Sequence, residues 1–306
     1  MDETLQGWIN LYKPKNISSF FAIKKIQSKF LIKKIGHCGT LDPLAEGILP
    51  IAIGKTTKLI PFVIKNEKKY IFSIKWGKQT STDDLEGIVI HSSNYIPSKE
   101  AIKNQLRKFT GQIEQIPPSA SAIKVNGQRA YKLFRENKNF LLKPKKVYVK
   151  KIKLLKSNQR KTTTFEIECS KGFYIRSFAR DLAISLGTFG HIYSLKRTKV
   201  GLFSLKSAIL LDDLLKIRQT LTEFNCIHSS VSMLDDILAY EIEDKEDLVN
   251  LSFGKSIFIE LNRLIKPPLN SFDKNLLFLL KKGKVLSYGK LNGHLFEPKK
   301  IFIEEI

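Results

Sequence analysis

The sequence predicts an α+β fold with a separate, smaller β-rich unit at its C-terminal end. Two segments, 7–12 and 69–77, alternate apolar and polar residues as strands do, and helical patterns lie between and after them. From about residue 241 the apolar runs become short and closely spaced, and the Asn292-Gly293 pair is typical of a tight hairpin. We therefore expect one domain over residues 1–240 and a small one over residues 241–306.

The N-terminal part combines a strand with an amphipathic helix. Residues 7–12 (GWINLY) form the strand, which Lys13-Pro14 ends. Ser18 or Ser19 can cap the helix that follows. Its apolar residues recur at helical spacing and predict a core-facing stripe: Phe20, Ala22, Ile23, Ile26 and Phe30. Its lysines fall largely off this stripe and predict a basic face: Lys24, Lys25, Lys29, Lys33 and Lys34.

The middle of the chain alternates strands and helices. In KYIFSIKWG, the residues Tyr70, Phe72, Ile74 and Trp76 share one face of a strand. A second helix is expected between Ser98, as its cap, and Gly111. The strand at 164–170 then leads into a third helix that ends at Gly187, with a buried stripe of Ile175, Phe178, Leu182 and Leu186.

A shaped loop stands between the first helix and a long apolar run. The segment 36–58, GHCGTLDPLAEGILPIAIGKTTK, begins with a mixture that neither helices nor strands favour. Its glycines allow positive φ or close approach of a ligand, and Pro43 restricts the backbone of Asp42. Asp42 is a candidate catalytic carboxylate, and a simple surface turn is the alternative. A phosphate-binding loop at its end is excluded, because that motif requires glycine at the position of Leu49.

The net charge of +23 indicates a polyanionic partner. Residues 241–306 carry 11 Lys or Arg and 10 Asp or Glu, so almost all of this charge falls on residues 1–240. The segment 143–161 alone holds nine Lys or Arg and no acid. Nucleic acid is the expected partner, and this segment is a plausible phosphate track.

The cysteines and the chain termini indicate an intracellular protein. The three cysteines, Cys38, Cys169 and Cys226, are scattered and have neither disulfide-framework nor zinc-ligand spacing. The first residues lack a signal-peptide pattern, and no apolar run approaches the roughly 20 residues of a membrane span. We therefore expect a cytoplasmic location, no membrane partner and no metal site.

The segment 36–58 resembles the signature of the TruB family, the bacterial tRNA pseudouridine-55 synthases. The family pattern is Gly-His-x-Gly-Thr-Leu-Asp-Pro-x-Ala-x-Gly-x-Leu, followed by Gly-x-x-Thr-Lys, and this chain matches it over its length. The resemblance implies the pseudouridine-synthase fold, in which a mixed, mostly antiparallel central sheet is flanked by helices and loops. It also implies a thumb-like insertion, here at about 112–145, and a small PUA-like β-barrel as the C-terminal unit.

The resemblance also implies site residues. Asp42 corresponds to the essential aspartate, and His37 to the histidine that helps to displace the flipped base. From spacing alone, Tyr70 in Lys68-Lys69-Tyr70 is better explained as a core residue, because strand aromatics usually serve packing. The resemblance reverses this: it makes Tyr70 the tyrosine that stacks on the uracil and takes part in removing the C5 proton. In the Lys-Gly-x-Tyr-Ile-Arg motif, Arg176 corresponds to the partner of the aspartate and Tyr174 to a residue against the site. Further substrate contacts are expected from Lys13, Gly39 and Thr40.

Two positions depart from the family pattern. Thr-Asp-Thr after the Tyr70 strand reads Thr80-Ser81-Thr82, which removes an aspartate. The aromatic residue expected after the double proline is Ala120, so a contact of the thumb is missing or is made elsewhere.

The resemblance predicts isomerisation of uridine 55 in the T loop of tRNA by a monomer that needs no cofactor, metal or protein partner. The reaction needs a positioned carboxylate, a pocket for the flipped base and a group that accepts the C5 proton. Two alternatives stay open: a non-catalytic RNA-binding or RNA-folding protein, and a guide-RNA-dependent synthase similar to dyskerin. The set Asp42, Tyr70 and Arg176 favours catalysis over binding alone, and the thumb-like insertion favours the stand-alone enzyme.

Overall fold

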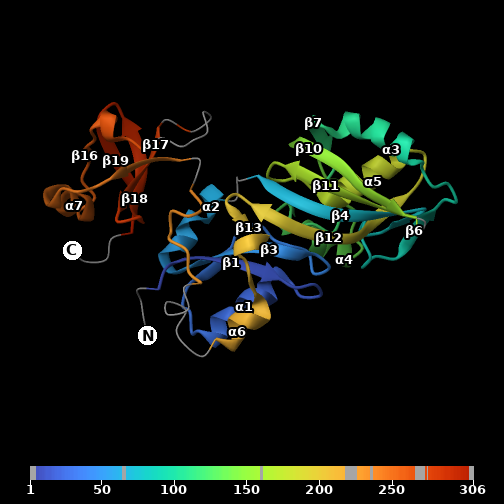
Figure 1. Ribbon diagram of the computed structural model, residues 1–306, viewed down its shortest axis with the longest axis horizontal. Coiled ribbons are helices and arrows are strands. Elements are labelled where there is room, and N and C mark those ends of the chain that lie inside the picture. Colours follow the sequence, from blue (N-terminus) through green and yellow to red (C-terminus); the bar gives the residue numbers. More distant parts are fainter. Residues whose placement is uncertain are drawn as a thin grey trace.

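The computed structural model describes residues 5–63, 67–158, 161–217, 226–234, 237–265, 273 and 275–302. A large mixed sheet with helices packed on it forms one part, and a curled five-stranded sheet forms the other (Figure 1). This arrangement confirms the predicted α+β class.

The large sheet is mixed and mostly antiparallel. Its strands are β1 (Gly7–Lys13), β2 (Ile35–His37), β3 (Glu46–Ile53), β4 (Lys68–Trp76), β7 (Gly111–Gln115), β10 (Lys145–Asn158), β11 (Thr162–Cys169), β12 (Gly190–Val200), β13 (Phe203–Ser204) and β14 (Ile209–Leu210). They follow the order β14-β1-β3-β12-β4-β11-β10-β7, while β13 pairs with β12 and β2 pairs with β3. The β1–β14 and β3–β12 pairs are parallel.

The centre of this sheet brings three distant segments into one row. Arg197 on β12 lies opposite Gly47 of β3 on one side and Tyr70 of β4 on the other. Gly47 has a φ of +109°, and a Cβ there would lie 2.2 Å from the carbonyl oxygen of Arg197. Only glycine therefore lets β3 and β12 approach this closely, next to the Asp42 loop.

Three helices cover the sheet. They are α1 (Ser19–Lys29), α3 (Lys99–Leu106) and α5 (Ile175–Ser185), and the short α6 (Leu211–Lys216) lies beside α1. The hydroxyls of Ser18 and Ser98 accept hydrogen bonds from the backbone N–H three residues later, as expected of N-caps. Helix α5 buries Ile175, Phe178 and Leu182, so the predicted stripe faces the core.

The expected core stripe of α1 is wrong at one position. Ala22, Ile23 and Ile26 are buried, whereas the side chain of Phe20 is 66% exposed. Successive residues of a helix lie about 100° apart, so Phe20 falls at the edge of the stripe that Ala22, Ile23 and Ile26 form, and its ring turns outward. The ammonium of Lys24 lies over the Phe20 ring, 5.6 Å from its centroid.

The insertion between β7 and β10 is built from short elements. Its two ends pair, with Gln115 opposite Lys145. Between them lie β8 (Lys124–Val125), β9 (Gln128–Arg129) and α4 (Ala130–Arg135). A further hairpin, β5 (Lys78–Thr80) and β6 (Val89–Ser92), follows β4 and stands at the same end of the sheet (Figure 1).

The C-terminal unit is a five-stranded sheet with one helix. It contains β15 (Leu238–Glu241), α7 (Lys245–Ser252), β16 (Ile257–Phe258), β17 (Leu276–Lys281), β18 (Lys284–Asn292) and β19 (Leu295–Ile301). The strand order is β15-β17-β18-β19-β16. The predicted hairpin at Asn292-Gly293 is confirmed, since Asn292 pairs with Leu295 and Gly293 has a φ of +59°.

The two parts share an apolar interface. The rings of Phe62, in the short helix α2 (Ile60–Val63), and Phe278 meet edge to face with centroids 5.0 Å apart. Trp8 of β1 is fully buried and belongs to the same hydrophobic cluster as Phe278 and Phe302 of the C-terminal unit. Because this interface is apolar, removal of the C-terminal unit would expose core residues of the first part.

Candidate active site

The Asp42 loop runs from the end of β2 to the start of β3 and is held by β1 and α1. The hydroxyl of Ser19, which is 1% exposed, donates to the carbonyl of Leu41 and accepts from its N–H, both at 2.9 Å. The N–H of Asn16 donates to the carbonyl of Pro43 at 2.8 Å. The backbone on both sides of Asp42 is thus fixed by hydrogen bonds, and its carboxylate is presented from a rigid support.

Arg176 pairs with Asp42 from the first turn of α5. Its Nε lies 3.0 Å from Oδ2 of Asp42, and its Nη2 donates to Oδ1 at 3.2 Å, so the contact is bidentate. Nη1 donates to the carbonyl of Thr82 at 3.2 Å, and Nη2 also donates to that of Ala120 at 3.1 Å. These contacts hold the guanidinium in one orientation, although the α5 macrodipole disfavours a cation there.

A second carboxylate, that of Asp84, was missed by the sequence analysis. Its side chain is 2% exposed, and its Oδ2 lies 3.5 Å from Nη1 of Arg176. The family pattern has its aspartate at the position of Ser81, whereas Asp84 comes three residues later in the β5–β6 turn. The signal was the Asp83-Asp84 pair in the loop between β5 and β6, since functional residues are often found on loops.

Burial and charge act in opposite directions on Asp42. Burial is the largest effect and raises the pKa of its carboxyl, and the carboxylate of Asp84 raises it further. The charges of Arg176 and Lys13 lower it, as do the hydrogen bonds from Arg176. About a third of the side chain, 34%, remains exposed, so the carboxylate is open to a ligand while its partner Arg176 is buried.

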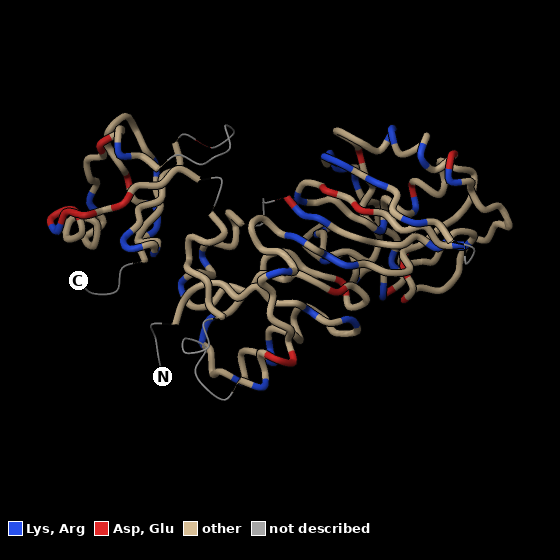
Figure 2. Tube along the Cα trace, in the orientation of Figure 1, with Lys and Arg blue, Asp and Glu red and all other residues tan. Residues whose placement is uncertain are grey.

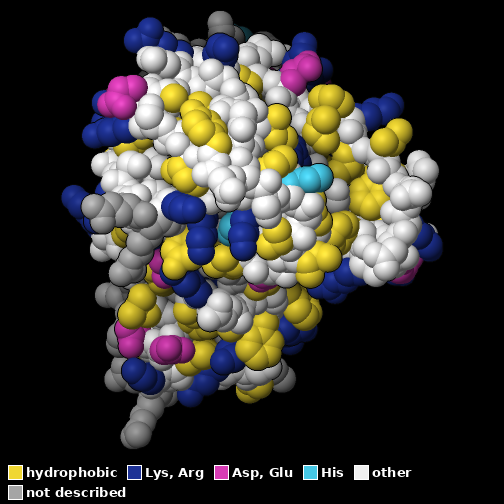
Figure 3. All heavy atoms as spheres, turned by 90° about the vertical axis from the view of Figure 1, so that its right-hand side faces the viewer, with side chains coloured by type: hydrophobic (Ala, Val, Ile, Leu, Met, Phe, Trp, Pro, Cys, Tyr) yellow, Lys and Arg dark blue, Asp and Glu magenta, His cyan; other side chains and the backbone are white. Residues whose placement is uncertain are grey.

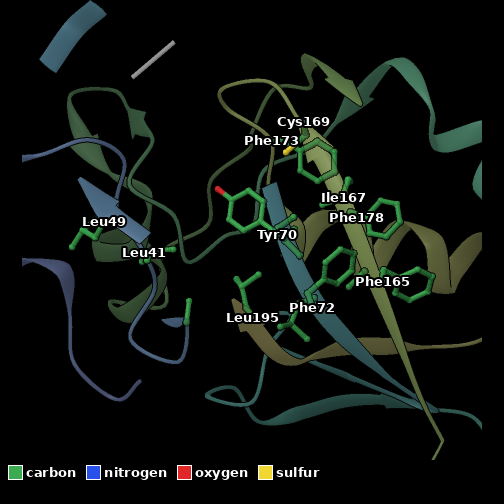
Figure 4. Packing of buried hydrophobic residues seen from close by; sticks show 14 of the residues in the cluster. Leu41, Leu49, Tyr70, Phe72, Phe165, Ile167, Cys169, Phe173, Phe178 and Leu195 are labelled. Carbon is green, nitrogen blue, oxygen red and sulfur yellow. The ribbon is translucent and has the colours of Figure 1, made fainter. Parts of the chain in front are cut away.

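Tyr70 directs its hydroxyl toward this site. Its ring lies beside Ile167 and Leu195, and its hydroxyl points away from the Phe72, Phe165 and Phe178 rings toward the side of Leu41 and Leu49 (Figure 4). Burial is the main effect and raises the pKa of the Tyr70 phenol, whereas the Arg197 charge lowers it. Tyr70, which is 8% exposed, therefore lies at the edge of the core, and its hydroxyl points toward the site.

His37 and Tyr174 come from two different elements near the loop. His37 ends β2, and burial, followed by the Arg197 charge, lowers the pKa of its imidazole, so the ring is mostly neutral at pH 7. Tyr174 immediately precedes α5, and its phenol is close enough to Asp42 and Arg176 that both charges act on its pKa, which burial raises. Its backbone is held by Gln115, whose amide accepts from the Tyr174 N–H at 3.0 Å.

The structure gives Lys13 a supporting position. Its side chain has no exposed surface, and its ammonium donates to the carbonyls of Pro14 and Ile17 at 2.8 Å. Burial lowers its pKa to about 8, against the opposing effect of Asp42. We therefore attribute to Lys13 the support of the loop in place of the expected substrate contact. Gly39, with a φ of +79°, and the exposed Thr40 lie on the loop itself and stay candidates for substrate contacts.

Basic residues follow the large sheet toward this site. Figure 2 shows Lys and Arg along β10, β4 and β12, whereas the acidic residues of the C-terminal unit gather at α7. The end face of the large part carries hydrophobic side chains between Lys and Arg, with few acids (Figure 3). Exposed apolar residues at this end include Ile88, Val89 and Ile90 of the β5–β6 hairpin. Apolar and cationic groups side by side are typical of surfaces that bind RNA.

Comparison with known proteins identifies the family. Residues 27–175 match the model of the TruB family pseudouridylate synthase N-terminal domain. The tRNA pseudouridine synthase B of Rickettsia bellii is 41% identical over 298 residues, which cover 96% of this chain and 97% of that protein. The chain belongs to the TruB family. The TruB-family protein of Bartonella bacilliformis with the same name is 37% identical over 313 residues, 98% of this chain and 96% of the relative.

Solved structures establish the fold of this TruB-family chain. The protein matched in a Cbf5-Nop10-Gar1 complex superposes with a TM-score of 0.73 at 21% identity, over 97% of this chain and 85% of that one. A chain in an archaeal box H/ACA sRNP Nop10-Cbf5 complex gives 0.70 at 19% identity, over 97% and 86%. The pseudouridine-synthase fold with a PUA-like C-terminal unit is thereby confirmed. None of the helices among the described residues is both long and apolar enough to cross a membrane.

Proposed function

We propose that this chain isomerises uridine 55 in the T loop of tRNA to pseudouridine. The observation that carries the proposal is the bidentate ion pair of Asp42 with Arg176, next to the Tyr70 hydroxyl. A protein that only bound RNA would not need a partly exposed carboxylate held by a buried arginine, since burying such charges is costly. The curated relatives that match nearly the whole chain carry the name tRNA pseudouridine synthase B.

Each site residue has a role in the proposed reaction. Asp42 initiates the break of the bond between C1′ and N1, either as a nucleophile or as a base. Arg176 keeps the Asp42 carboxylate ionised against the effect of burial. The detached base turns within the pocket and rejoins C1′ through C5, while His37 and Tyr174 line its surroundings. The Tyr70 ring stacks on the base, and its hydroxyl takes part in the removal of the C5 proton.

We propose that the chain acts as a monomer in the cytoplasm, without a guide RNA. The support is the agreement in length with relatives named for tRNA, together with the insertion between β7 and β10 beside the site. The alternative is a guided enzyme, suggested by the shared fold of the proteins in the H/ACA complexes. Activity of the purified chain on tRNA alone separates these two possibilities.

Mapping of pseudouridine in tRNA tests the proposed function directly. Unmodified tRNA is incubated with the purified chain, and pseudouridine is located by chemical labelling and primer extension. We expect modification at position 55 and none in a tRNA whose uridine 55 is replaced with cytidine. Binding without any pseudouridine would favour the RNA-binding alternative, and activity only after addition of a guide RNA would favour the guided one.

The Tyr70→Phe substitution tests the role of the hydroxyl. The ring and its stacking are kept, so tRNA affinity is expected to stay within about twofold of the parent. The single-turnover rate is expected to fall by about 10²-fold, which is the lower end of the range for the loss of an acid–base group. Phe72→Leu, a change of a neighbouring core ring without a hydroxyl, is the control for packing. A parental rate in Tyr70→Phe would assign Tyr70 to stacking or packing alone.

Salt titration tests the basic surface of β10. Lys146, Lys151 and Lys153 are exposed, and their replacement with Met removes cations from the expected phosphate track. Each lost phosphate contact is expected to reduce the slope of log affinity against log salt by about 0.7–0.9. Replacing Lys245 and Lys255 of the C-terminal unit with Met is the control and is expected to have a smaller effect. If the salt dependence of affinity had the same slope in both sets of variants, the RNA contact would lie outside the β10 surface.

A further inference from the structure

Arg197 is one of the largest fully buried side chains of the protein and has no role in the reaction described so far. It lies on β12 with 1% of its surface exposed. Its backbone stands between Gly47 and Tyr70 in the sheet register. A buried guanidinium is costly unless its N–H groups are satisfied, so its partners indicate why it is there.

The hydrogen bonds of Arg197 reach both ends of the Asp42 loop. Its Nε donates to the carbonyl of Ile48 at 2.7 Å, and its Nη2 donates to the carbonyl of Gly39 at 2.8 Å. Gly39 precedes Asp42 by three residues, and Ile48 follows it by six. A Cβ on Gly39 would lie 3.4 Å from Nη1, which shows how closely the guanidinium packs under the loop. The planar guanidinium donates to these two carbonyls from separate nitrogens in one rigid plane, whereas a lysine ammonium would have to donate to both from a single rotating nitrogen.

Arg197 also acts on the Tyr70 hydroxyl, from the position paired with Tyr70 across β12 and β4. Its positive charge lowers the pKa of the phenol, against burial, which is the largest effect and raises it. The other groups that act on Tyr70 are Cys169 of β11 and Asp42 of the loop, and both raise its pKa. Arg197 is thus the cation among the groups that act on the phenol, and it favours the state in which the hydroxyl has given up or shares its proton.

We propose that Arg197 is a positioning residue for the isomerisation, which holds the Asp42 loop and the Tyr70 hydroxyl in register from beneath the site. This inference rests on the proposed function. Arg176 fixes the Asp42 carboxylate, whereas Arg197 fixes the backbone that carries it and the group that faces the base. Because a displacement of about 1 Å can cost about 10²-fold in rate, loss of this support damages the reaction without any contact to the substrate.

Two substitutions separate position from charge. Arg197→Lys keeps the cation and loses the fork, so the loop is expected to be held at one end only. Arg197→Met keeps much of the apolar volume and loses the charge as well. Both variants are expected to show a single-turnover rate about 10-fold to 10²-fold lower than the parent, with tRNA affinity within about threefold. Lys206→Met, which removes an exposed lysine outside β10, β4 and β12, is the control for loss of a cation and is expected to keep the single-turnover rate at saturating enzyme.

The pH dependence of the single-turnover rate is the measurement that would stay unchanged if the role of Arg197 were only structural. With Arg197→Met the pKa of Tyr70 loses an opposing effect and rises, so the rise of the rate that follows ionisation of Tyr70 is expected to move to higher pH. With Arg197→Lys the charge stays, and this rise is expected to coincide with that of the parent. Parental rates in both variants, or identical pH profiles in the two, would overturn the proposal. If the parent itself forms no pseudouridine, the proposed function has failed; if only the Arg197 variants behave as the parent, this inference alone has failed.

Discussion

Asp42→Asn is expected to abolish pseudouridine formation while the protein still folds and binds tRNA. The asparagine keeps the shape of the side chain, and the loop that carries it is held by Ser19, Asn16 and Arg197 through bonds that do not involve the carboxylate. What is lost is the charge that attacks or deprotonates the sugar. A single-turnover assay with labelled tRNA is expected to show no product above background, with tRNA affinity within about twofold of the parent.

Asp83→Asn is the matched control for this change. Asp83 is 5% exposed and pairs with Arg180 at 3.1 Å, so it is a buried, arginine-bound aspartate that does not contact Arg176 through its carboxylate in the described residues. Its loss is expected to lower stability and to leave measurable turnover. Melting temperatures of both variants separate a folding defect from a catalytic one. Turnover in Asp42→Asn at a rate comparable to Asp83→Asn would remove Asp42 from the reaction and favour the RNA-binding alternative.

Much of the fold was accessible from the sequence because its signals are local. Alternating residues define β4, the Ser18 and Ser98 caps start α1 and α3, and Asn292-Gly293 closes the β18–β19 hairpin. These depend on neighbours along the chain, which a sequence shows directly. The outward turn of Phe20 was not accessible, because it depends on which part of α1 the sheet covers.

The site was accessible only in part, for the same reason. Asp42 and Arg176 lie 134 positions apart, and their pairing was expected from the family resemblance and not from their spacing. Asp84 contacts Arg176 of α5, and Arg197 of β12 contacts Gly39 of the loop. No local sequence pattern connects these segments. Lys13 was expected to contact the substrate, whereas the three carbonyl groups near its ammonium make it a buried support, and no local pattern shows these partners.

Arg176→Met is expected to lower the single-turnover rate at pH 7 by about 10²-fold, because the variant loses both the bidentate contact that orients the Asp42 carboxylate and the cation that favours its ionised form. The change leaves the carboxylates of Asp42 and Asp84 facing each other without the cation between them. Burial and the Asp84 charge already raise the pKa of Asp42, and Arg176 is the largest effect that opposes them. Without it the pKa of Asp42 rises further, since two neighbouring carboxylates cannot both ionise easily. At neutral pH a larger fraction of the variant therefore carries a protonated, inactive Asp42.

The sign of this effect gives the test. Raising the pH ionises Asp42 again, so part of the lost rate is expected to return, and the acidic limb of the Arg176→Met profile is expected to lie at higher pH than that of the parent. Arg180 lies on the same helix as Arg176 and pairs with Asp83. Arg180→Met breaks that pair and is expected to leave the acidic limb in place. An Arg176→Met profile parallel to that of the parent at every pH would mean that the arginine only orients Asp42. A shifted limb identifies Arg176 as the residue that keeps the Asp42 carboxylate ionised in a buried site.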